Sequence, residues 1–88
     1  MESKIIAVRV EHPGTHERHI VRFRLESGSE MEKEAMVAFL LFNPNTFYTY
    51  ADGKKAYVMV AFTEAGKPYV KTKADDTTAN NLLSLPRF

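Results

Sequence analysis

The chain has 88 residues, of which 44% are hydrophobic and 26% are charged, and it carries a formal net charge of +1 and no cysteine. This length allows one thin hydrophobic core, so we expect residues 1–88 to form a single domain, and the composition excludes a disordered chain. The balanced charge excludes a global attraction to nucleic acid or lipid, and the absence of thiols excludes disulfides and thiolate zinc sites.

The first predicted elements are two strands, residues 4–11 and 19–26, whose side chains alternate with the period of two that is typical of a half-buried strand. Pro13 and Gly14 lie between them and favour a turn, so we expect a hairpin. One face of this hairpin carries Ile6, Val8, Val10, Val21, Phe23 and Leu25. The arginines of the two strands lie on the opposite face, which we expect to face solvent.

A helix is predicted from Ser29 to the residue before Asn43. Ser29 and Glu32 have the spacing of a capping box, in which each side chain bonds a main-chain N–H that the helix leaves unpaired. Pro44 ends the helix, because proline disfavours helical geometry at the residue before it. Apolar residues recur at spacings of three and four and widen into a broad face, so we expect a mostly buried helix. They are Met31, Ala35, Met36, Val37, Phe39, Leu40, Leu41 and Phe42.

A second hairpin is predicted from residues 46–51 and 55–63, joined by Asp52-Gly53, a pair that suits a tight turn. A short last strand covers residues 68–73 and begins at a proline, as an edge strand can. The apolar residues of the segment 82–88 form a short helical turn that covers the sheet. We therefore predict an α+β fold: an antiparallel sheet of four or five strands in the order ββαβββ, one helix packed on one face, and a C-terminal tail that closes the structure.

No stretch of the sequence approaches the roughly 18 apolar residues that a membrane-spanning helix needs. The first four residues lead directly into the first predicted strand. We expect neither membrane insertion nor secretion, and a cytoplasmic location.

The three histidines, His12, His16 and His19, lie in the predicted first hairpin loop. Neutral imidazoles at such a spacing can ligate a metal ion, with Glu11 or Glu17 beside them. Zinc ligands normally come in tighter pairs, and a surface loop exposes histidines without any such role. The sequence leaves both interpretations open, and we assign no metal ligand.

Arg9, Arg22 and Arg24 share one face of the first predicted hairpin. Clustered arginines bind phosphates through a planar fork of donors, so a nucleic-acid surface is one interpretation. The other is an ordinary solvent face on which glutamates pair with the arginines, and we favour it because phosphate-binding domains usually carry a clear basic excess. The candidate partners are Glu11, Glu17 and Glu26.

Five aromatic residues of the second hairpin, with lysines between them, have a pattern that also occurs on platforms that stack unpaired bases. In a domain this small, such residues more often form the core and its rim, and this is our expectation. They are Phe47, Tyr48, Tyr50, Tyr57 and Phe62, with Lys54 and Lys55 between them.

No group of residues has the arrangement of a catalytic site. The serines lie in termini, a turn or the tail, without the context of a nucleophile elbow. Each glycine fits a single turn rather than a phosphate-cradling loop, and a core this thin leaves little room for a deep pocket. We expect no enzymatic activity and no cofactor.

The chain opens with Ile6-Ala7-Val8-Arg9, continues near its end with residues 66–73 and 75–77, and closes with the pattern Asn-Leu-x-x-Leu-Pro-x-Phe at residues 81–88. In these segments it resembles a family of short uncharacterised bacterial proteins, a domain of unknown function. The resemblance implies a compact α+β fold and a bacterial or phage-related cytoplasmic origin. It brings no activity, cofactor or catalytic residue with it.

The leading functional hypothesis is a non-catalytic binding module that recognises a protein partner, for instance by pairing with an exposed strand edge near Tyr69. The alternative is nucleic-acid binding through Arg9, Arg22 and Arg24. An unpaired edge strand is compatible with a monomer and with a homodimer.

Overall fold

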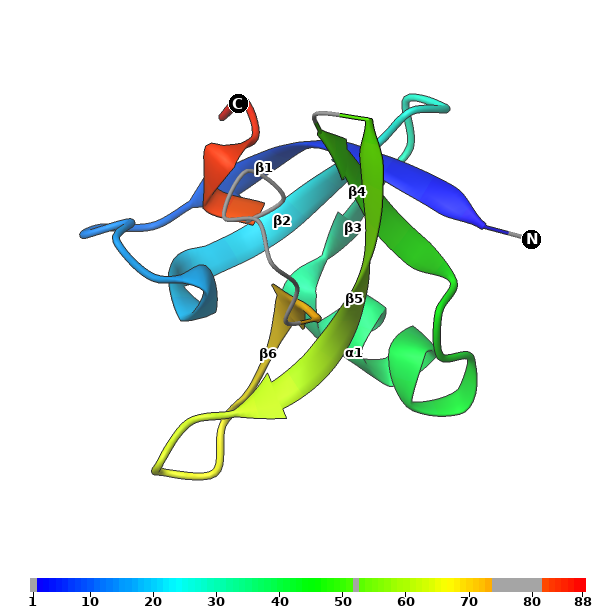
Figure 1. Cartoon of the computed structure of the whole chain (residues 1–88). Helices are drawn as coiled ribbons and strands as arrows, with labels where there is room; N and C mark the ends of the chain where they lie inside the picture. Colours follow the sequence, from blue (N-terminus) through cyan, green and yellow to red (C-terminus); the bar gives the residue numbers. More distant parts are fainter. Residues whose placement is uncertain (1, 52, 74–81) are drawn as a thin grey trace.

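The computed structural model describes residues 2–51, 53–73 and 82–88 of the chain. Within these residues, a mixed sheet of six strands curves around one α-helix, in the order β3-β2-β1-β4-β5-β6 (Figure 1). The elements are β1 (Ser3–Val10), the short 3-10 helix η1 (Glu17–His19), β2 (Ile20–Leu25), β3 (Glu30–Glu32), α1 (Lys33–Phe42), β4 (Phe47–Ala51), β5 (Lys54–Phe62), β6 (Pro68–Thr72) and the 3-10 helix η3 (Leu82–Ser84). The prediction of an α+β fold is confirmed.

The first hairpin forms as predicted, but its core face differs from the expected one. The register between β1 and β2 shifts twice, and each irregularity changes which side chains face the core. Ile5 and Val8 are therefore both fully buried, whereas Ile6 is half-buried. For the same reason Ile20 belongs to the core in place of Val21. A strict period of two cannot predict these shifts.

The segment predicted as the first turn of the helix forms a third strand. Glu30 and Glu32 lie on β3 opposite Arg24 and Arg22 of β2, and their carboxylates form ion pairs with these arginines. This pairing replaces the predicted capping box, since Glu32 is the N-cap residue and its side chain makes no capping hydrogen bond. The helix therefore begins at Lys33, and the element order is βββαβββ.

The second hairpin and the last strand form as predicted. Tyr48 of β4 pairs with Tyr57 of β5, and β5 pairs with β6 along most of its length. Gly53 has the positive φ angle of 74° expected in the tight turn, while Asp52 lies outside the described residues. β1 and β4 are parallel, with Ser3 opposite Phe47, so the sheet is mixed rather than wholly antiparallel. The chain can enter β4 parallel to β1 because β2, β3 and α1 form a long crossover between them.

The core lies between α1 and the concave face of the sheet. Only one stripe of α1 is buried, and the last turn exposes large apolar side chains, so the prediction of a mostly buried helix is wrong. The helix is also too short to cross a membrane, as is every other helix among the described residues. The buried core residues include Ile5, Val8, Ile20, Phe23, Leu25, Met36, Val37, Leu40, Phe47, Val58, Val70 and Leu82.

The C-terminal segment closes the structure, as predicted. Leu82 is 0% exposed and belongs to the core. The N–H of Val8 donates to the carbonyl of Pro86 at 2.9 Å, and the carbonyl of Val8 accepts from the N–H of Phe88 at 3.1 Å. The segment therefore lies along the edge of β1 that does not face β2, as Figure 1 shows. The residues 75–77 and 80–81, which contribute to the family resemblance, lie outside the described residues.

Candidate functional site

The three arginines that the sequence places on one face of the first hairpin do come together on the outer face of β1 and β2. Arg9 lies directly opposite Arg22 in the strand register. Arg22 forms ion pairs with Glu30 at 2.8 Å and with Glu32 at 3.2 Å, and Arg24 forms one with Glu30 at 3.1 Å. The glutamates that pair with the arginines are thus those of β3. The predicted candidates were Glu11, Glu17 and Glu26.

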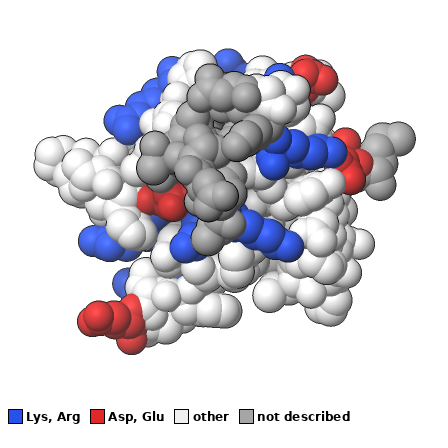
Figure 2. Space-filling model, viewed as in Figure 1, with Lys and Arg blue, Asp and Glu red and all other residues white. Residues whose placement is uncertain are grey.

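Glu30 is the centre of this ion-pair network. The hydrogen bond from Arg22, followed by that from Arg24, lowers the pKa of the Glu30 carboxyl below its ordinary value. The hydrogen bond between Arg22 and Glu30 also raises the pKa of the Arg22 guanidinium. On the face shown in Figure 2, the lysine and arginine side chains are scattered over the surface, and some of them lie beside acidic ones. Arg22 and Arg24 therefore already have anionic partners within the domain.

The ring of Phe88 packs against the guanidinium groups of Arg9 and Arg24. The guanidinium carbon of Arg24 lies 4.2 Å from the centre of the Phe88 ring, and that of Arg9 lies 5.0 Å from it. Arg9 Nε also donates a hydrogen bond to the main-chain oxygen of Phe88 at 3.1 Å. These cation–π contacts attach the C-terminal segment to the outer face of the sheet. The arginine face thus has a structural role in the fold.

The histidine loop also has a structural role. His16 Nδ1 accepts a hydrogen bond from the main-chain N–H of Arg18 at 3.0 Å. His19 Nδ1 accepts from the N–H groups of Thr15 and His16, at 3.2 and 3.1 Å. The two imidazoles therefore form a capping box at the N-terminal end of the short helix η1. Within the described ranges, no three His, Cys, Asp or Glu side chains form a group that can hold a metal ion.

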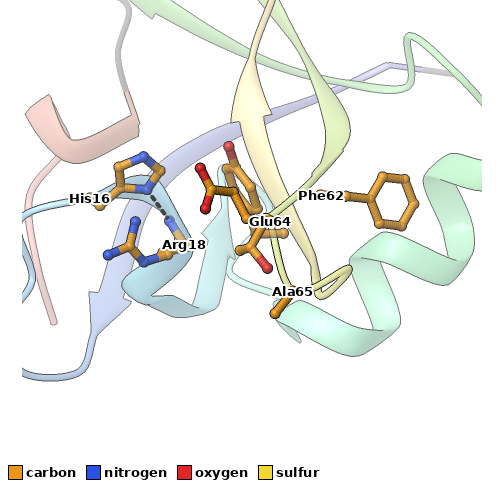
Figure 3. A pocket seen from close by; sticks show the side chains of 7 residues that line it. His16, Arg18, Phe62, Glu64 and Ala65 are labelled. Carbon is orange, nitrogen blue, oxygen red and sulfur yellow. Dashed lines mark hydrogen bonds between the residues drawn. The ribbon is translucent and has the colours of Figure 1, made fainter.

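A groove lies between η1 and the turn that joins β5 to β6 (Figure 3). One hollow of about 460 Å³ and a second of about 370 Å³ share Arg18 and Tyr69 among their lining residues. Figure 3 shows the hydrogen bond between His16 and Arg18 on one side of this groove and the ring of Phe62 pointing away from both residues. The groove carries charges of both signs, so it offers no field of one sign to a charged ligand. These residues are Glu11, Arg18, Lys33, Glu64 and Lys67.

The strand edge near Tyr69, predicted as a site for partner pairing, is largely covered. β6 is the edge strand, but η1 packs against it and the Glu17 carboxylate accepts a hydrogen bond from the N–H of Thr72 at 3.2 Å. Pro68, at the start of the strand, has no N–H to offer. A partner strand therefore finds few free donors on this edge.

A different surface is open. At the end of α1, Phe42 is 86% exposed and Leu41 is 60% exposed, and Met59 of β5 lies nearby with 39% of its surface exposed. Leu41 and Met59 line a recess of about 220 Å³ whose other walls are mostly apolar. We call Leu41, Phe42 and Met59, together with this recess, the helix-end surface. The remaining described lining residues are Leu40, Pro44, Asn45, Val58, Val60 and Lys73.

The aromatic residues of the second hairpin divide between core and surface. Phe47 is buried, as predicted, and Tyr48 and Tyr57 are half-buried. Tyr50 and Phe62 are exposed, so the expectation of core placement is wrong for these two. Lys55 lies 4.3 Å from the Tyr48 ring centre and 5.2 Å from that of Tyr57. The outer face of β4 and β5 thus carries an aromatic cluster whose faces are partly covered by a lysine.

Glu2 completes this cluster. Its carboxylate accepts hydrogen bonds from Lys55 and from the hydroxyl of Tyr57. The bond from Lys55, followed by that from Tyr57, lowers the pKa of Glu2, and the bond to Glu2 raises the pKa of Lys55. The charge of Lys55 is therefore compensated within the domain, as those of Arg22 and Arg24 are.

Comparison with known proteins gives one assignment. Residues 4–86 match a family described as a protein of unknown function, DUF3892. The chain belongs to the DUF3892 family. No curated protein and no solved structure matches this DUF3892 chain significantly. The resemblance that the sequence suggested, to an uncharacterised domain family, is confirmed at this level.

The helix-end surface of this DUF3892 domain is the feature that sequence reasoning missed. Phe39, Leu40, Leu41 and Phe42 are consecutive, so their side chains point in all directions around the helix axis. A helix that packs on one face of a sheet can bury only some of them. The run of four apolar residues was therefore the signal that part of this turn is exposed.

Proposed function

We propose that this DUF3892 domain is a non-catalytic protein-interaction module and that its partner binds the helix-end surface. The observation that carries the proposal is the exposure of Leu41, which lines an apolar recess, and of Phe42, the next residue of the helix. Large apolar side chains grouped around a recess on a small domain are typical of interaction sites. Burying them against a partner removes apolar area from water, which contributes about 25 cal/mol per Å².

The size of the recess supports a protein partner over a small metabolite. Pockets for drug-sized ligands usually hold about 300–1,000 Å³. The recess holds about 220 Å³, which suits one or two apolar side chains of a partner. A side chain inserted there, with Phe42 packed against its neighbours, would give the buried centre that dominates the binding energy of many interfaces.

The alternative function, nucleic-acid binding through Arg9, Arg22 and Arg24, has less support. Glu30 and Glu32 already pair with two of these arginines, and Phe88 contacts Arg9 and Arg24. A phosphate would have to displace these partners. The helix-end surface, in contrast, is already exposed.

Affinity capture with matched variants tests the proposal. The full chain, a variant that combines Leu41→Ser with Phe42→Ser, and the control variant Tyr50→Ser serve as bait, and captured protein and nucleic acid are both measured. Tyr50 is 51% exposed and does not line the recess, so the control changes an exposed aromatic residue outside the helix-end surface. Each captured protein is then purified and titrated against all three baits by calorimetry.

We expect a partner whose affinity falls about tenfold or more in the Leu41→Ser and Phe42→Ser variant and stays constant in the control. Thermal melts should show that all three baits are folded, because the changed side chains are exposed. A partner that binds all three equally would contradict the proposal. Captured nucleic acid that is lost when Arg9, Arg22 and Arg24 become alanine would support the alternative instead.

A further inference from the structure

β5 extends well beyond the strand that pairs with it on one side. The pairing of β4 with β5 runs from Ala51 opposite Lys54 to Tyr48 opposite Tyr57, and β4 begins at Phe47. β5 continues to Phe62. On the other side, β6 accompanies β5 over this whole stretch. The last part of β5 is therefore paired on one edge only.

The direction of the main-chain groups identifies which residues are free. The N–H of Lys73 donates to the carbonyl of Tyr57 at 2.8 Å, which shows that Tyr57 faces β6. In an antiparallel ladder every second residue faces the same neighbour, so Met59 and Ala61 also face β6. Val60 and Phe62 therefore direct their N–H and carbonyl groups away from β6. No other described main-chain group bonds to them on that side.

The domain covers or blunts its other strand edges. The outer edge of β6 is covered by Glu17, the free part of the β1 edge by the C-terminal segment, and β3 has only three residues, two of them glutamates. Such features normally prevent unwanted strand pairing. At Val60 and Phe62 of β5, in contrast, no described main-chain group pairs with the strand on this side, and the edge borders the helix-end surface. This contrast indicates an edge that is kept open for a partner.

The recess lies directly beside this free edge. Three consecutive β5 residues, Val58, Met59 and Val60, line it, together with residues of the α1 end. Lys73 is the one charged residue among the described lining residues. Its ammonium donates to Asn45 Oδ1 at 2.6 Å, which leaves two of its three N–H donors for a further acceptor.

We propose that the partner presents an extended strand that pairs with β5 at Val60 and Phe62, inserts a large apolar side chain into the recess and places a carboxylate beside Lys73. This inference rests on the proposed function and specifies its ligand. Main-chain hydrogen bonds give such strand addition its affinity, and side-chain pockets give it specificity. The free donors and acceptors, the apolar recess and the cation each match one part of such a segment.

A second copy of the chain fits this edge less well. Two β5 edges could pair around Ala61, but each copy would then bring its own Lys73 and no acidic group to the described walls of the recess. Like charges near an interface lower its stability, whereas an Asp or Glu of a different protein complements the lysine. We therefore assign the edge to a heterologous acidic and apolar strand.

Selection of short random peptides displayed on phage, with the full chain as target, tests the inference. We expect the selected peptides to share a β-branched, extended pattern with one large apolar residue next to Asp or Glu. Synthetic versions with N-methylated amides on one alternate set of residues should bind about tenfold more weakly, because these amides face β5. Methylation of the other set should leave affinity unchanged.

A pair of variants examines the same contact from the side of the domain. Phe62→Thr and Phe62→Pro both remove the aromatic ring, but only proline removes the N–H that faces the free edge. This N–H makes no bond to β6, so proline is compatible with the hairpin. We expect Phe62→Pro to bind the selected peptides about tenfold more weakly than Phe62→Thr does.

The outcomes separate this inference from the proposed function. In one outcome, the peptides lose binding to the Leu41→Ser and Phe42→Ser variant, but they tolerate methylation of either set and bind both Phe62 variants equally. This result would overturn the proposed strand pairing and leave the proposed interaction surface intact. Peptides that are insensitive to the helix-end variant, or a library that yields no binder, would overturn both. A dimer seen by light scattering that dissociates in Phe62→Pro would show that the occupant is a second copy.

Discussion

The outer edge of β6 and the edge of β5 at Val60 and Phe62 belong to the same hairpin, yet one is covered by another part of the chain and the other is not. On β6, the strand begins at Pro68, and the carboxylate of Glu17 accepts the hydrogen bond of the Thr72 N–H. On β5, Val60 and Phe62 direct their main-chain groups to an edge that borders the exposed apolar side chains of Leu41 and Met59. We call the first the closed edge and the second the open edge.

The comparison shows that covering an edge depends on contacts between distant parts of the chain. Glu17 comes from the loop before β2, and the segment that covers β1 comes from the end of the chain. Each of these elements is itself held in place by specific side chains. Replacing those side chains in turn measures how much each contact contributes to the stability of the closed edges.

The largest effect is expected from Leu82→Ala, which removes the core anchor of the C-terminal segment. Leu82 is 0% exposed, and replacing a fully buried leucine by alanine usually lowers the free energy of unfolding by about 2–5 kcal/mol. Urea unfolding measures this change. Leu41→Ala is the matched control on the open side, because Leu41 is exposed, and it should change stability by less than about 0.5 kcal/mol. Equal effects of the two substitutions would contradict the contrast.

Glu17→Ala should open the closed edge itself. The variant leaves the Thr72 N–H without its acceptor, and the expected loss of stability is about 1 kcal/mol. Hydrogen exchange gives a more specific readout, because the Thr72 amide should exchange faster while the amides of Val58 and Phe23 in the core keep their protection. Glu64→Ala, in the turn after β5, is the control. If Thr72 exchange stays unchanged in Glu17→Ala, Glu17 does not close this edge.

Phe88→Leu should loosen the far end of the C-terminal segment. Leucine keeps an apolar side chain but lacks the ring face on which Arg9 and Arg24 lie. A loss of about 0.5–1 kcal/mol is expected, since this is the usual magnitude of an exposed cation–π contact. Thermal melts measure it, and Phe88→Tyr, which keeps the ring, should melt like the wild type. Identical melting of the leucine and tyrosine variants would refute a role for the ring.

The smallest expected effect is a pH dependence that acts through the helix carrying Glu17. Burial of the His19 imidazole, followed by the charge of Arg18, holds its pKa below the ordinary value of 6.5. The unfolded chain therefore binds more protons than the folded one as the pH falls below about 6.5, and stability falls with it. The contribution of His19 to the free energy of unfolding is fully present above that pH, where the imidazole is neutral in both the folded and the unfolded chain.

A series of urea midpoints between pH 7.5 and pH 5 measures this dependence. His19→Asn keeps an acceptor for the N–H groups of Thr15 and His16 but cannot be protonated, so part of the pH slope should disappear. An unchanged slope would assign the dependence to other groups. Faster exchange of Thr72 at low pH in the wild type would link the imidazole to the closed edge.

The parts of the fold that depend on residues adjacent in the sequence were predictable from the sequence. Pro13-Gly14 and Gly53 indicated the two hairpins, and Pro68 indicated an edge strand. The α+β class and the role of the C-terminal segment followed from the same patterns. β3 was not predictable, because Ser29 and Glu32 also satisfy a local capping pattern, and only the pairing of Glu30 with Arg22 and Arg24 decides between strand and helix.

The candidate sites were less predictable for the same reason. The arginine face was located correctly, but its partners on β3 and at Phe88 were not. The capping role of His16 and His19 depends on the orientation of their Nδ1 atoms toward the backbone. The helix-end surface depends on which stripe of α1 meets the sheet.

By itself, the sequence determined the turns, the alternation along the strands and the presence of one apolar helix, because these follow from the conformational limits of Gly and Pro and from local periodicity. The tertiary structure alone decided which side of that helix is buried and which strand edges are covered. Those outcomes rest on contacts such as Glu17 with Thr72 and Phe88 with Arg24, which join residues far apart in the chain and leave no periodic trace in it.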